Sequence, residues 1–260
     1  MTLKEFKNNI FYHASAKQNR ESLVLLHGLG GTGYAFKRLF LALEKKDVSF
    51  IAPDHPSHGK TIESDFVKYV EFILNLLTER RSERFIIISH SFGAVYAELL
   101  FERAKERIDQ IMLVTPLLEA RKQTKGMGLF TYDHPFLFDV AGNLMSVLPQ
   151  RWRYPDYCRL GKKPYPFYWM SDMTHCNIRE YFRIQRFVSE KRMTNIDFMS
   201  FSRVHLGKSD TITYADLTEK LVRGCAQKVV VHEGDHLYPL KEHRIFEDEV
   251  FSILKEKKYV

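Results

Sequence analysis

Ser91 is the residue with which the chemistry of this chain begins. It stands at the centre of the run S-H-S-F-G (residues 89–93) and follows F-I-I-I (residues 85–88), four apolar residues that predict a strand covered on both faces. The apolar residues after Ser91 recur at helical spacing, so the chain passes quickly from strand to helix. A serine hydroxyl is a poor nucleophile until a base takes its proton and an acid orients that base. A reactive Ser91 therefore needs a histidine and a carboxylate from elsewhere in the chain.

The neighbours of Ser91 suit a crowded turn. Ser89 and Gly93, two positions before and after it, are small enough to relieve the crowding of the backbone. The pattern resembles the nucleophile elbow G-x-S-x-G of the α/β-hydrolase family, with serine in place of the first glycine. The resemblance implies an α/β-hydrolase fold, in which a mostly parallel central sheet is flanked by helices, and an esterase- or lipase-like enzyme with Ser91 as its nucleophile.

A glycine-rich turn at residues 27–33 follows another buried strand pattern, L-V-L-L at residues 23–26. Its glycine spacing also fits G-x-G-x-x-G, the fingerprint of dinucleotide-binding folds. However, residues 54–60 resemble the D-x-x-G-x-G-x-S loop of α/β hydrolases, which favours the hydrolase interpretation. By the geometry of that family, the resemblance implies an oxyanion hole made by the backbone N–H groups of Leu29 and Phe92.

The family's order of catalytic residues identifies the base and the acid. In α/β hydrolases the nucleophile is followed by an acid and then by a histidine, each in a loop behind a strand. Asp210 follows a strand predicted at residues 201–206, and His236 follows one predicted at residues 228–232. The resemblance therefore implies a triad of Ser91, Asp210 and His236.

Other residues compete for these roles. His232 lies within a predicted strand and His243 within a predicted helix, so neither suits a base that must reach over the edge of the sheet. Asp235 is adjacent to His236 in sequence and is expected to point elsewhere. Glu119 lies beyond its strand, in a stretch that has left the strand pattern. His90 alternates away from the nucleophile and is kept as a residue that packs or lines the wall of a substrate pocket.

The segment at residues 121–203 interrupts the alternation of strands and helices. It holds 14 Lys or Arg and 7 Asp or Glu, so its net charge of +7 equals that of the whole chain. Because insertions between strands of α/β hydrolases are normally caps, we expect residues 121–200 to form a helical cap, or lid, on a core made of residues 1–120 and 201–260. Most of its aromatic residues should pack in the cap's own small core. Trp152, Tyr168 and Trp169 are candidates for lining the substrate pocket.

Composition narrows the classes of protein to which the chain can belong. The chain has 260 residues and three cysteines without C-x-x-C spacing, which predicts neither a disulfide framework nor a zinc site. His55 and His58 could be read as a metal pair, but no third ligand is suitably spaced, so we expect no metal and no cofactor. The basic residues are dispersed and form no recognised module, which argues against nucleic acid. No apolar run is long enough to span a bilayer, and the default prediction is a cytoplasmic protein.

The predicted function is hydrolysis of a carboxylic ester with a small or medium acyl group, through an acyl-enzyme on Ser91. The predicted partner is a small-molecule ester, and a basic cap would also attract an ester that carries an anionic portion. Two alternatives remain open. An acyltransferase or a C–C bond hydrolase would use the same triad. A non-catalytic member of the fold would use the site only as a ligand pocket, but its usual mark is a damaged triad, and this one is complete.

Overall fold

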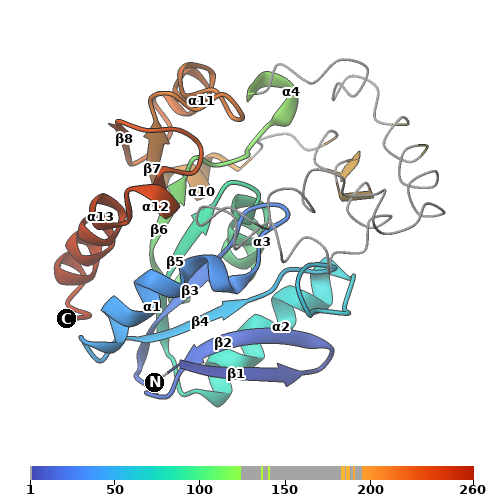
Figure 1. Ribbon diagram of the computed structural model, residues 1–260, viewed down its shortest axis with the longest axis vertical. Helices are drawn as coiled ribbons and strands as arrows, with labels where there is room; N and C mark the ends of the chain where they lie inside the picture. Colours follow the sequence, from blue (N-terminus) through green and yellow to red (C-terminus); the bar gives the residue numbers. More distant parts are fainter. Residues whose placement is uncertain are drawn as a thin grey trace, which may run out of the picture.

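The computed structural model describes residues 2–123 and 195–260, together with residues 136, 140, 183, 184, 186, 187 and 190. The cap predicted at residues 121–200 lies largely outside the described residues, so its boundaries and helical character stay predictions. Trp152, Tyr168 and Trp169 also lie outside the described residues. The described chain folds into one central sheet with helices on both faces (Figure 1).

Eight strands form the sheet, in the order β1-β2-β4-β3-β5-β6-β7-β8. The strands are β1 (Thr2–Lys7), β2 (Ile10–Ser15), β3 (Glu21–Leu26), β4 (Ser49–Pro53), β5 (Arg84–His90), β6 (Ile108–Val114), β7 (Ser202–Gly207) and β8 (Lys228–His232). The pairs β1/β2 and β2/β4 are antiparallel, and every other pair is parallel. The predicted fold class, an α/β fold with a mostly parallel sheet, is confirmed.

Helices cover the two faces of this sheet. They are α1 (Lys37–Glu44), α2 (Phe66–Glu79), α3 (Gly93–Ala104), α4 (Ala120–Gln123), α10 (Ile196–Ser200), α11 (Ala215–Val222), α12 (Tyr238–Lys241) and α13 (His243–Glu256), with 3-10 turns η1 (Gly33–Phe36) and η2 (Lys105–Arg107). One apolar core lies under α2 and α3, and a second lies under α1 and α13. Each core buries a different face of the sheet.

The central strands are apolar at every position because both of their faces are buried. In β5, Phe85 and Ile87 point into the core under α2 and α3, whereas Ile86 and Ile88 point into the core under α1 and α13. Each fully buried side chain of this size stabilises the fold by about 1.5–3 kcal/mol relative to its exposed state. The strand that leads to Ser91 is therefore strongly stabilised by burial of its side chains.

Residues 9–15 have the mixed apolar and polar character that favours an edge strand, but residues 10–15 form β2, which is covered on its outer side by β1. β1 was missed because its sequence T-L-K-E-F-K gives no buried apolar pattern, and three of its central residues are exposed. A polar strand of this kind suits a sheet edge, where charged side chains discourage pairing with another chain.

Gly93 allows α3 to begin directly against β3. A Cβ atom on Gly93 would lie 2.5 Å from the carbonyl oxygen of Leu26, which is a backbone atom and cannot rotate away. Glycine at this position therefore lets the start of α3 contact the end of β3, the strand that lies beside β5 in the sheet.

This close approach predicts that Gly93→Ala lowers the free energy of unfolding by about 3 kcal/mol, because the new methyl group must push two backbone segments apart. Gly224→Ala is the matched control. Gly224 has φ +81° and no atom within 4 Å of its Cβ position, so the change adds only left-handed strain of about 1 kcal/mol. Urea unfolding of both variants makes the comparison, and equal losses would contradict the steric argument.

Candidate functional site

The backbone of Ser91 is held in a conformation that serine rarely adopts. Its φ of +51° lies in the left-handed region, which costs a non-glycine residue about 1–2 kcal/mol. Its amide donates to the carbonyl oxygen of Val114 at 2.9 Å, and its carbonyl oxygen accepts from the amides of Leu117 at 3.0 Å and Ala94 at 3.1 Å. These bonds fix the turn between β5 and α3, and with it the direction of the Ser91 side chain.

Ser91, His236 and Asp210 form a line of hydrogen bonds. His236 Nδ1–H donates to Asp210 Oδ2 at 2.8 Å, and His236 Nε2 lies 2.9 Å from Ser91 Oγ. Because Nδ1 carries the proton, Nε2 is free to accept the proton of the Ser91 hydroxyl. All three side chains are buried. The structure thus brings together, in donor-to-acceptor order, the three residues that the family resemblance paired.

Asp210 is stabilised in its charged form. Burial raises the pKa of its carboxyl, but hydrogen bonds from His236, Thr213 and the amide of Ile212 outweigh burial and lower the pKa overall. The amides of Ile212 and Thr213 donate to Oδ1 at 2.8 and 2.9 Å, and the Thr213 hydroxyl donates to Oδ2 at 2.8 Å. The carboxylate is therefore ionised at neutral pH and aimed at His236.

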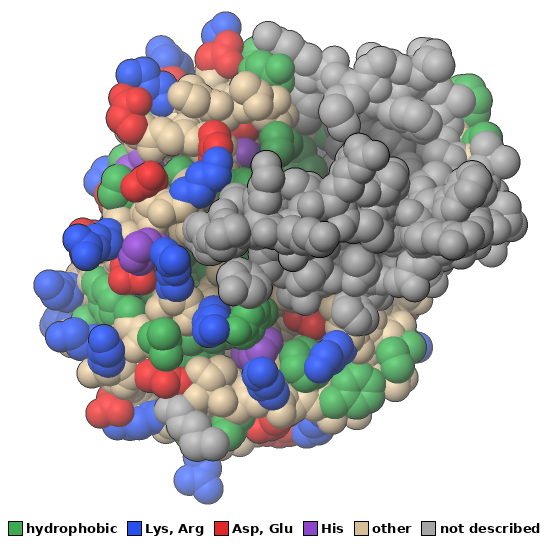
Figure 2. Space-filling view, in the orientation of Figure 1, with side chains coloured by type: hydrophobic (Ala, Val, Ile, Leu, Met, Phe, Trp, Pro, Cys, Tyr) green, Lys and Arg blue, Asp and Glu red, His purple; other side chains and the backbone are tan. Residues whose placement is uncertain are grey.

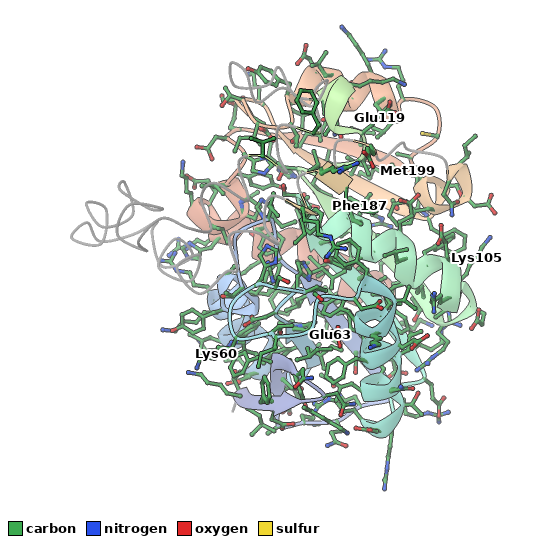
Figure 3. All side chains as sticks on the ribbon, turned by 90° about the vertical axis from the view of Figure 1, so that its right-hand side faces the viewer. Lys60, Glu63, Lys105, Glu119, Phe187 and Met199 are labelled. Atoms are coloured by element: carbon green, nitrogen blue, oxygen red, sulfur yellow. The ribbon has the colours of Figure 1, made fainter. Side chains whose placement is uncertain are left out.

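The competing acids make other contacts. Asp235 accepts from the amide of Leu237 at 2.9 Å and pairs with Lys241. Glu119, which lies where the chain enters α4 (Figure 3), forms an ion pair with Lys122 at 3.3 Å. Each carboxylate thus has a cation of its own, and neither is bonded to the histidine ring.

The competing bases are also engaged elsewhere. The ring of His243 lies on α13, where its Nδ1 is 2.7 Å from the guanidinium of Arg38. His232 closes β8, and its Nε2 is 3.0 Å from Nδ1 of His205 on the neighbouring strand. Neither contact involves Ser91.

His90 and Thr115 hold the backbone of His236. His90 Nε2–H donates to the His236 carbonyl oxygen at 3.0 Å, and the Thr115 hydroxyl donates to the same oxygen at 3.2 Å. Burial, assisted by the neighbouring His236, lowers the pKa of His90 to about 4, so the ring is neutral at pH 7. Thr115 was not identified from sequence, and a role for His90 in lining a pocket stays a prediction.

The glycine-rich turn behind β3 lies against the elbow. A Cβ atom on Gly28 would lie 2.8 Å from His90 Nδ1 and 3.3 Å from Ser91 Cβ, so only glycine allows this approach. Across the described residues, the amides of Leu29 and Phe92 donate no hydrogen bond within the protein. Phe92 directly follows Ser91 in sequence, and Leu29 directly follows Gly28, the glycine that lies against the elbow.

A buried pair of histidines clamps that turn. His27 Nδ1–H donates to the Gly28 carbonyl oxygen at 2.8 Å, and His27 Nε2 accepts from the amide of His55 at 2.9 Å. His55 Nε2–H donates to the His27 carbonyl oxygen at 2.7 Å, and its Nδ1 accepts from the Tyr69 hydroxyl at 2.7 Å. Burial lowers the pKa of both rings far below the usual value, so both stay neutral. This clamp was not identified from sequence.

The metal pair considered for His55 and His58 has another explanation. His58 Nδ1–H donates to the Pro56 carbonyl oxygen at 2.8 Å, and its ring packs near those of His27 and His55. Burial lowers the pKa of His58 to about 4. Where the structure describes the chain, no third ligand-type side chain lies close enough to complete a metal site with this pair.

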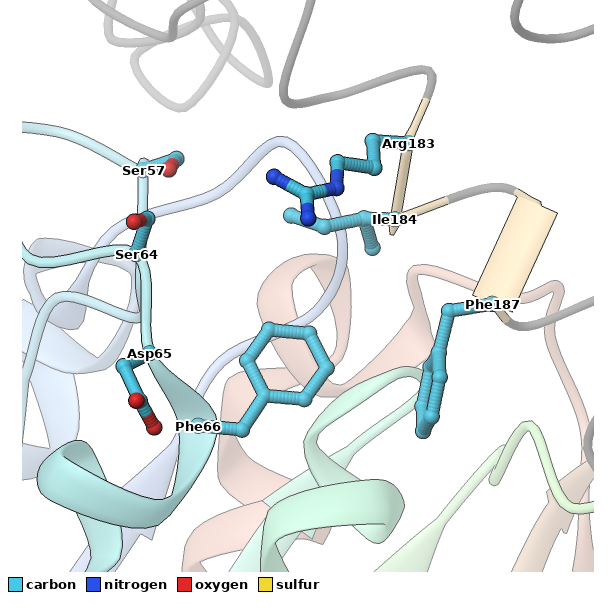
Figure 4. A pocket seen from close by; sticks show the side chains of 7 residues that line it. All are labelled: Ser57, Ser64, Asp65, Phe66, Arg183, Ile184 and Phe187. Carbon is cyan, nitrogen blue, oxygen red and sulfur yellow. The ribbon is translucent and has the colours of Figure 1, made fainter.

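A separate cavity of about 390 Å³ opens between the start of α2 and residues 183, 184 and 187. It is lined by Ser57, Ser64, Asp65, Phe66, Arg183, Ile184 and Phe187. Figure 4 shows Arg183 and Ile184 across the cavity from the two serines and Asp65. Ring contacts at 5.2–5.4 Å run from Phe187 through Phe66 and Tyr96 to Phe92, the residue after Ser91. The cavity wall is thereby packed against the elbow.

Charged side chains are mixed on the surface. On the face that Figure 2 presents, the described Lys and Arg side chains are interspersed with Asp and Glu. Several form exposed ion pairs, such as Lys208 with Glu233 at 2.8 Å. No described helix has the length and apolar character needed to cross a membrane.

Comparison with known proteins identifies similar chains. The model of the alpha/beta hydrolase family matches residues 23–250. A Mycoplasma pneumoniae protein described as an esterase/lipase is 32% identical over 105 residues, which cover 38% of this chain and 39% of that protein. The match thus spans about two fifths of the length of that curated relative.

Two solved structures share the fold. A hydrolase from Pseudomonas aeruginosa superimposes with a TM-score of 0.72 at 16% identity, covering 97% of this chain and 98% of that one. An esterase from Exiguobacterium antarcticum gives 0.72 at 13% identity, covering 98% and 100%. At such identities the likeness concerns the fold alone.

The buried histidines predict a loss of stability in acid. The pKa values of His27, His55, His58, His90 and His205 are all lowered by burial, so the folded state binds fewer protons than the unfolded chain below about pH 6.5. Each such ring removes about 1.4 kcal/mol per pH unit as pH falls from 6.5 towards its folded pKa. Urea unfolding at pH 7, 6 and 5 should show a steep decline, and a flat profile would contradict neutral buried rings.

Proposed function

The chain belongs to the alpha/beta hydrolase family, and from that membership we propose that it hydrolyses carboxylic esters through Ser91, His236 and Asp210. The observation that carries the proposal is the line of hydrogen bonds from Ser91 Oγ to His236 Nε2 at 2.9 Å and from His236 Nδ1 to Asp210 Oδ2 at 2.8 Å. A hydroxyl, a base and an ionised acid in this order are the parts that serine nucleophilic catalysis needs.

In the first half of the reaction, His236 Nε2 takes the Ser91 proton as Oγ attacks the ester carbonyl carbon. The negative charge on the carbonyl oxygen is bound by the amides of Leu29 and Phe92, each worth about 3–4 kcal/mol of transition-state stabilisation. The imidazolium then gives its proton to the alkoxy oxygen as the C–O bond breaks. Alcohol leaves and an acyl-enzyme on Ser91 remains.

In the second half, His236 takes a proton from water, and the resulting nucleophile attacks the acyl carbon. Collapse of this second intermediate releases the carboxylic acid and returns the proton to Ser91 Oγ. Asp210 stays ionised throughout and stabilises the imidazolium. His90 supports the same step because its ring is neutral, so no second positive charge opposes protonation of His236.

The substrate that we propose is an ester with a small or medium acyl group. The relative from Mycoplasma pneumoniae, described as an esterase/lipase, supports an ester as the substrate. An anionic portion on the substrate stays a prediction, because most of the basic segment lies outside the described residues.

The alternatives on the same triad differ in what accepts the acyl group or in which bond breaks. An acyltransferase would pass the acyl group to an added alcohol or thiol in preference to water, and a C–C bond hydrolase would leave simple esters largely uncleaved. Analysis of the products formed with and without such an acceptor distinguishes these reactions from ester hydrolysis.

The proposed nucleophile predicts that Ser91→Ala lowers the rate of hydrolysis of a short-chain p-nitrophenyl ester by about 10⁶-fold and abolishes labelling by a fluorophosphonate. Ser89→Ala is the matched control, since Ser89 is buried two residues away and its hydroxyl has no partner among the described residues. It should keep both properties. Activity that survives in Ser91→Ala would refute the nucleophile, and failure of the wild-type protein to label would favour a non-catalytic, ligand-binding member.

The proposed acid predicts that Asp210→Asn lowers kcat by about 10⁴-fold, because an amide no longer fixes the Nδ1–H tautomer of His236 or stabilises its charge. Asp235→Asn carries the same change on the neighbouring loop, where the carboxylate contacts Lys241 instead. Steady-state kinetics should show activity within a few-fold of wild type for Asp235→Asn. A larger loss in that variant than in Asp210→Asn would reverse the assignment.

A further inference from the structure

His205, His232 and Glu249 form a cluster of possible metal ligands that the proposed reaction does not use. One ligand atom from each lies within 4.8 Å of the others. His205 belongs to β7, His232 ends β8, and Glu249 lies on α13. We propose that this cluster is a binding site for a divalent transition-metal ion, with Zn²⁺ as the ion that best matches its two imidazoles and one carboxylate. The proposal does not depend on the role of Ser91.

The distance between one nitrogen of each histidine ring is close to the distance between two nitrogens that bind one ion. His205 Nδ1 and His232 Nε2 are 3.0 Å apart. Two nitrogens bound to one tetrahedral Zn²⁺ at about 2.0–2.1 Å are about 3.3 Å apart. The rings therefore need to separate by only a few tenths of an ångström and turn toward the ion. The carboxylate of Glu249 supplies the third ligand, and water can fill the fourth position.

The protonation of the cluster suits a metal. His205 Nδ1 and His232 Nε2 share one hydrogen bond, so one of these two nitrogens presents its lone pair and the other carries the proton. Neutral imidazole is the form that binds metal. When an ion replaces the shared proton, that proton moves to the other nitrogen of one ring, so no charge is lost from the ligands. The negative charge of Glu249 offsets part of the ion's charge.

Tyr238 packs against the cluster. Its ring stacks on His232 with centroids 5.1 Å apart. The Tyr238 hydroxyl and His205 Nε2 are buried and have no hydrogen-bond partner in the described parts of the chain. Neither atom is a ligand in the proposed site, because the ion would bind His205 through Nδ1 while the other ring nitrogen keeps its proton.

Repulsion from the nearby basic residues does not prevent binding of a positive ion. Lys228 and Arg203 are the basic residues whose charges reach His205. Arg203 is already neutralised by Glu256, which accepts from its guanidinium at 2.6 and 2.7 Å. His205 is fully buried whereas His232 and Glu249 are half-buried, so an ion can enter from the side of the latter two.

An ion here would be structural. His232 lies four residues before His236, and its carbonyl oxygen accepts from the amide of Lys208 at 2.8 Å, two residues before Asp210. The ion would therefore tie together β7, β8 and α13 at the bases of the loops that carry the proposed acid and base. We expect it to raise stability and to restrain those two loops.

The first test is Zn²⁺ titration of the full chain after removal of metals with a chelator. Calorimetry should show one ion per chain with a Kd of micromolar or below, and saturating Zn²⁺ should raise Tm by several degrees. Mg²⁺, which prefers oxygen ligands, should do neither. Absence of Zn²⁺ binding at millimolar concentration would overturn the proposal.

Variants separate this site from adventitious binding to surface histidines. Glu249→Gln should weaken Zn²⁺ binding by at least about tenfold and remove the Tm shift. Glu247→Gln carries the same change two positions earlier, about 200° around α13, and should bind like wild type. His232→Gln, checked for folding by circular dichroism, serves as a second ligand variant. Wild-type affinity in both Glu249→Gln and His232→Gln would show that the ion binds elsewhere.

Discussion

The left-handed turn at Ser91 is the constraint on which the rest of the structure depends. A serine keeps φ at +51° only because its surroundings leave the backbone no alternative. β6 supplies part of this restraint through Val114 and the residues after it, which bond both backbone groups of Ser91. The remainder comes from two glycines: Gly93 lets α3 start against β3, and Gly28 lets the preceding turn touch the elbow. Three adjacent strands, β3, β5 and β6, thus restrain the backbone of Ser91.

Buried polar groups around this turn are stabilised by hydrogen bonds more than by charge. Asp210 is the buried carboxylate of the site, and three donors from its own loop compensate for its loss of solvent. Burial keeps His27, His55, His58 and His90 neutral, and the tautomer of each is set by a backbone or hydroxyl partner. In the proposed reaction, protonation of His236 would therefore create a single new charge, which would face the Asp210 carboxylate. The electrostatics of the proposed site would then act on the reacting groups.

The sequence predicted the features that depend on neighbouring residues in the chain, namely the buried strands and the turn at Ser91. Strands buried on both faces appear as unbroken apolar runs, such as residues 85–88, and a small residue on each side of Ser91 marks its turn. The order of Asp210 and His236 came from resemblance to a family. Thr115 and the clamp formed by His27 and His55 could not be found in this way, because each acts on a residue far away in the chain and depends on strand order and register. β1 was not predicted because a polar edge strand has no apolar pattern in its sequence.

The β7–β8 end of the sheet matters for the site because the loops that carry Asp210 and His236 begin there. Among the described strands, β8 pairs only with β7, and its side chains are partly buried or exposed, so fewer contacts hold it than hold β5. Both the proposed acid and the proposed base lie on loops that leave these two strands. Gly207 lets the loops approach each other, since a Cβ there would lie 2.4 Å from the carbonyl oxygen of Asp235. The 2.8 Å contact between His236 and Asp210 therefore depends on the packing of this edge of the sheet. A group that joins β7, β8 and α13 would act directly on the geometry of the proposed base.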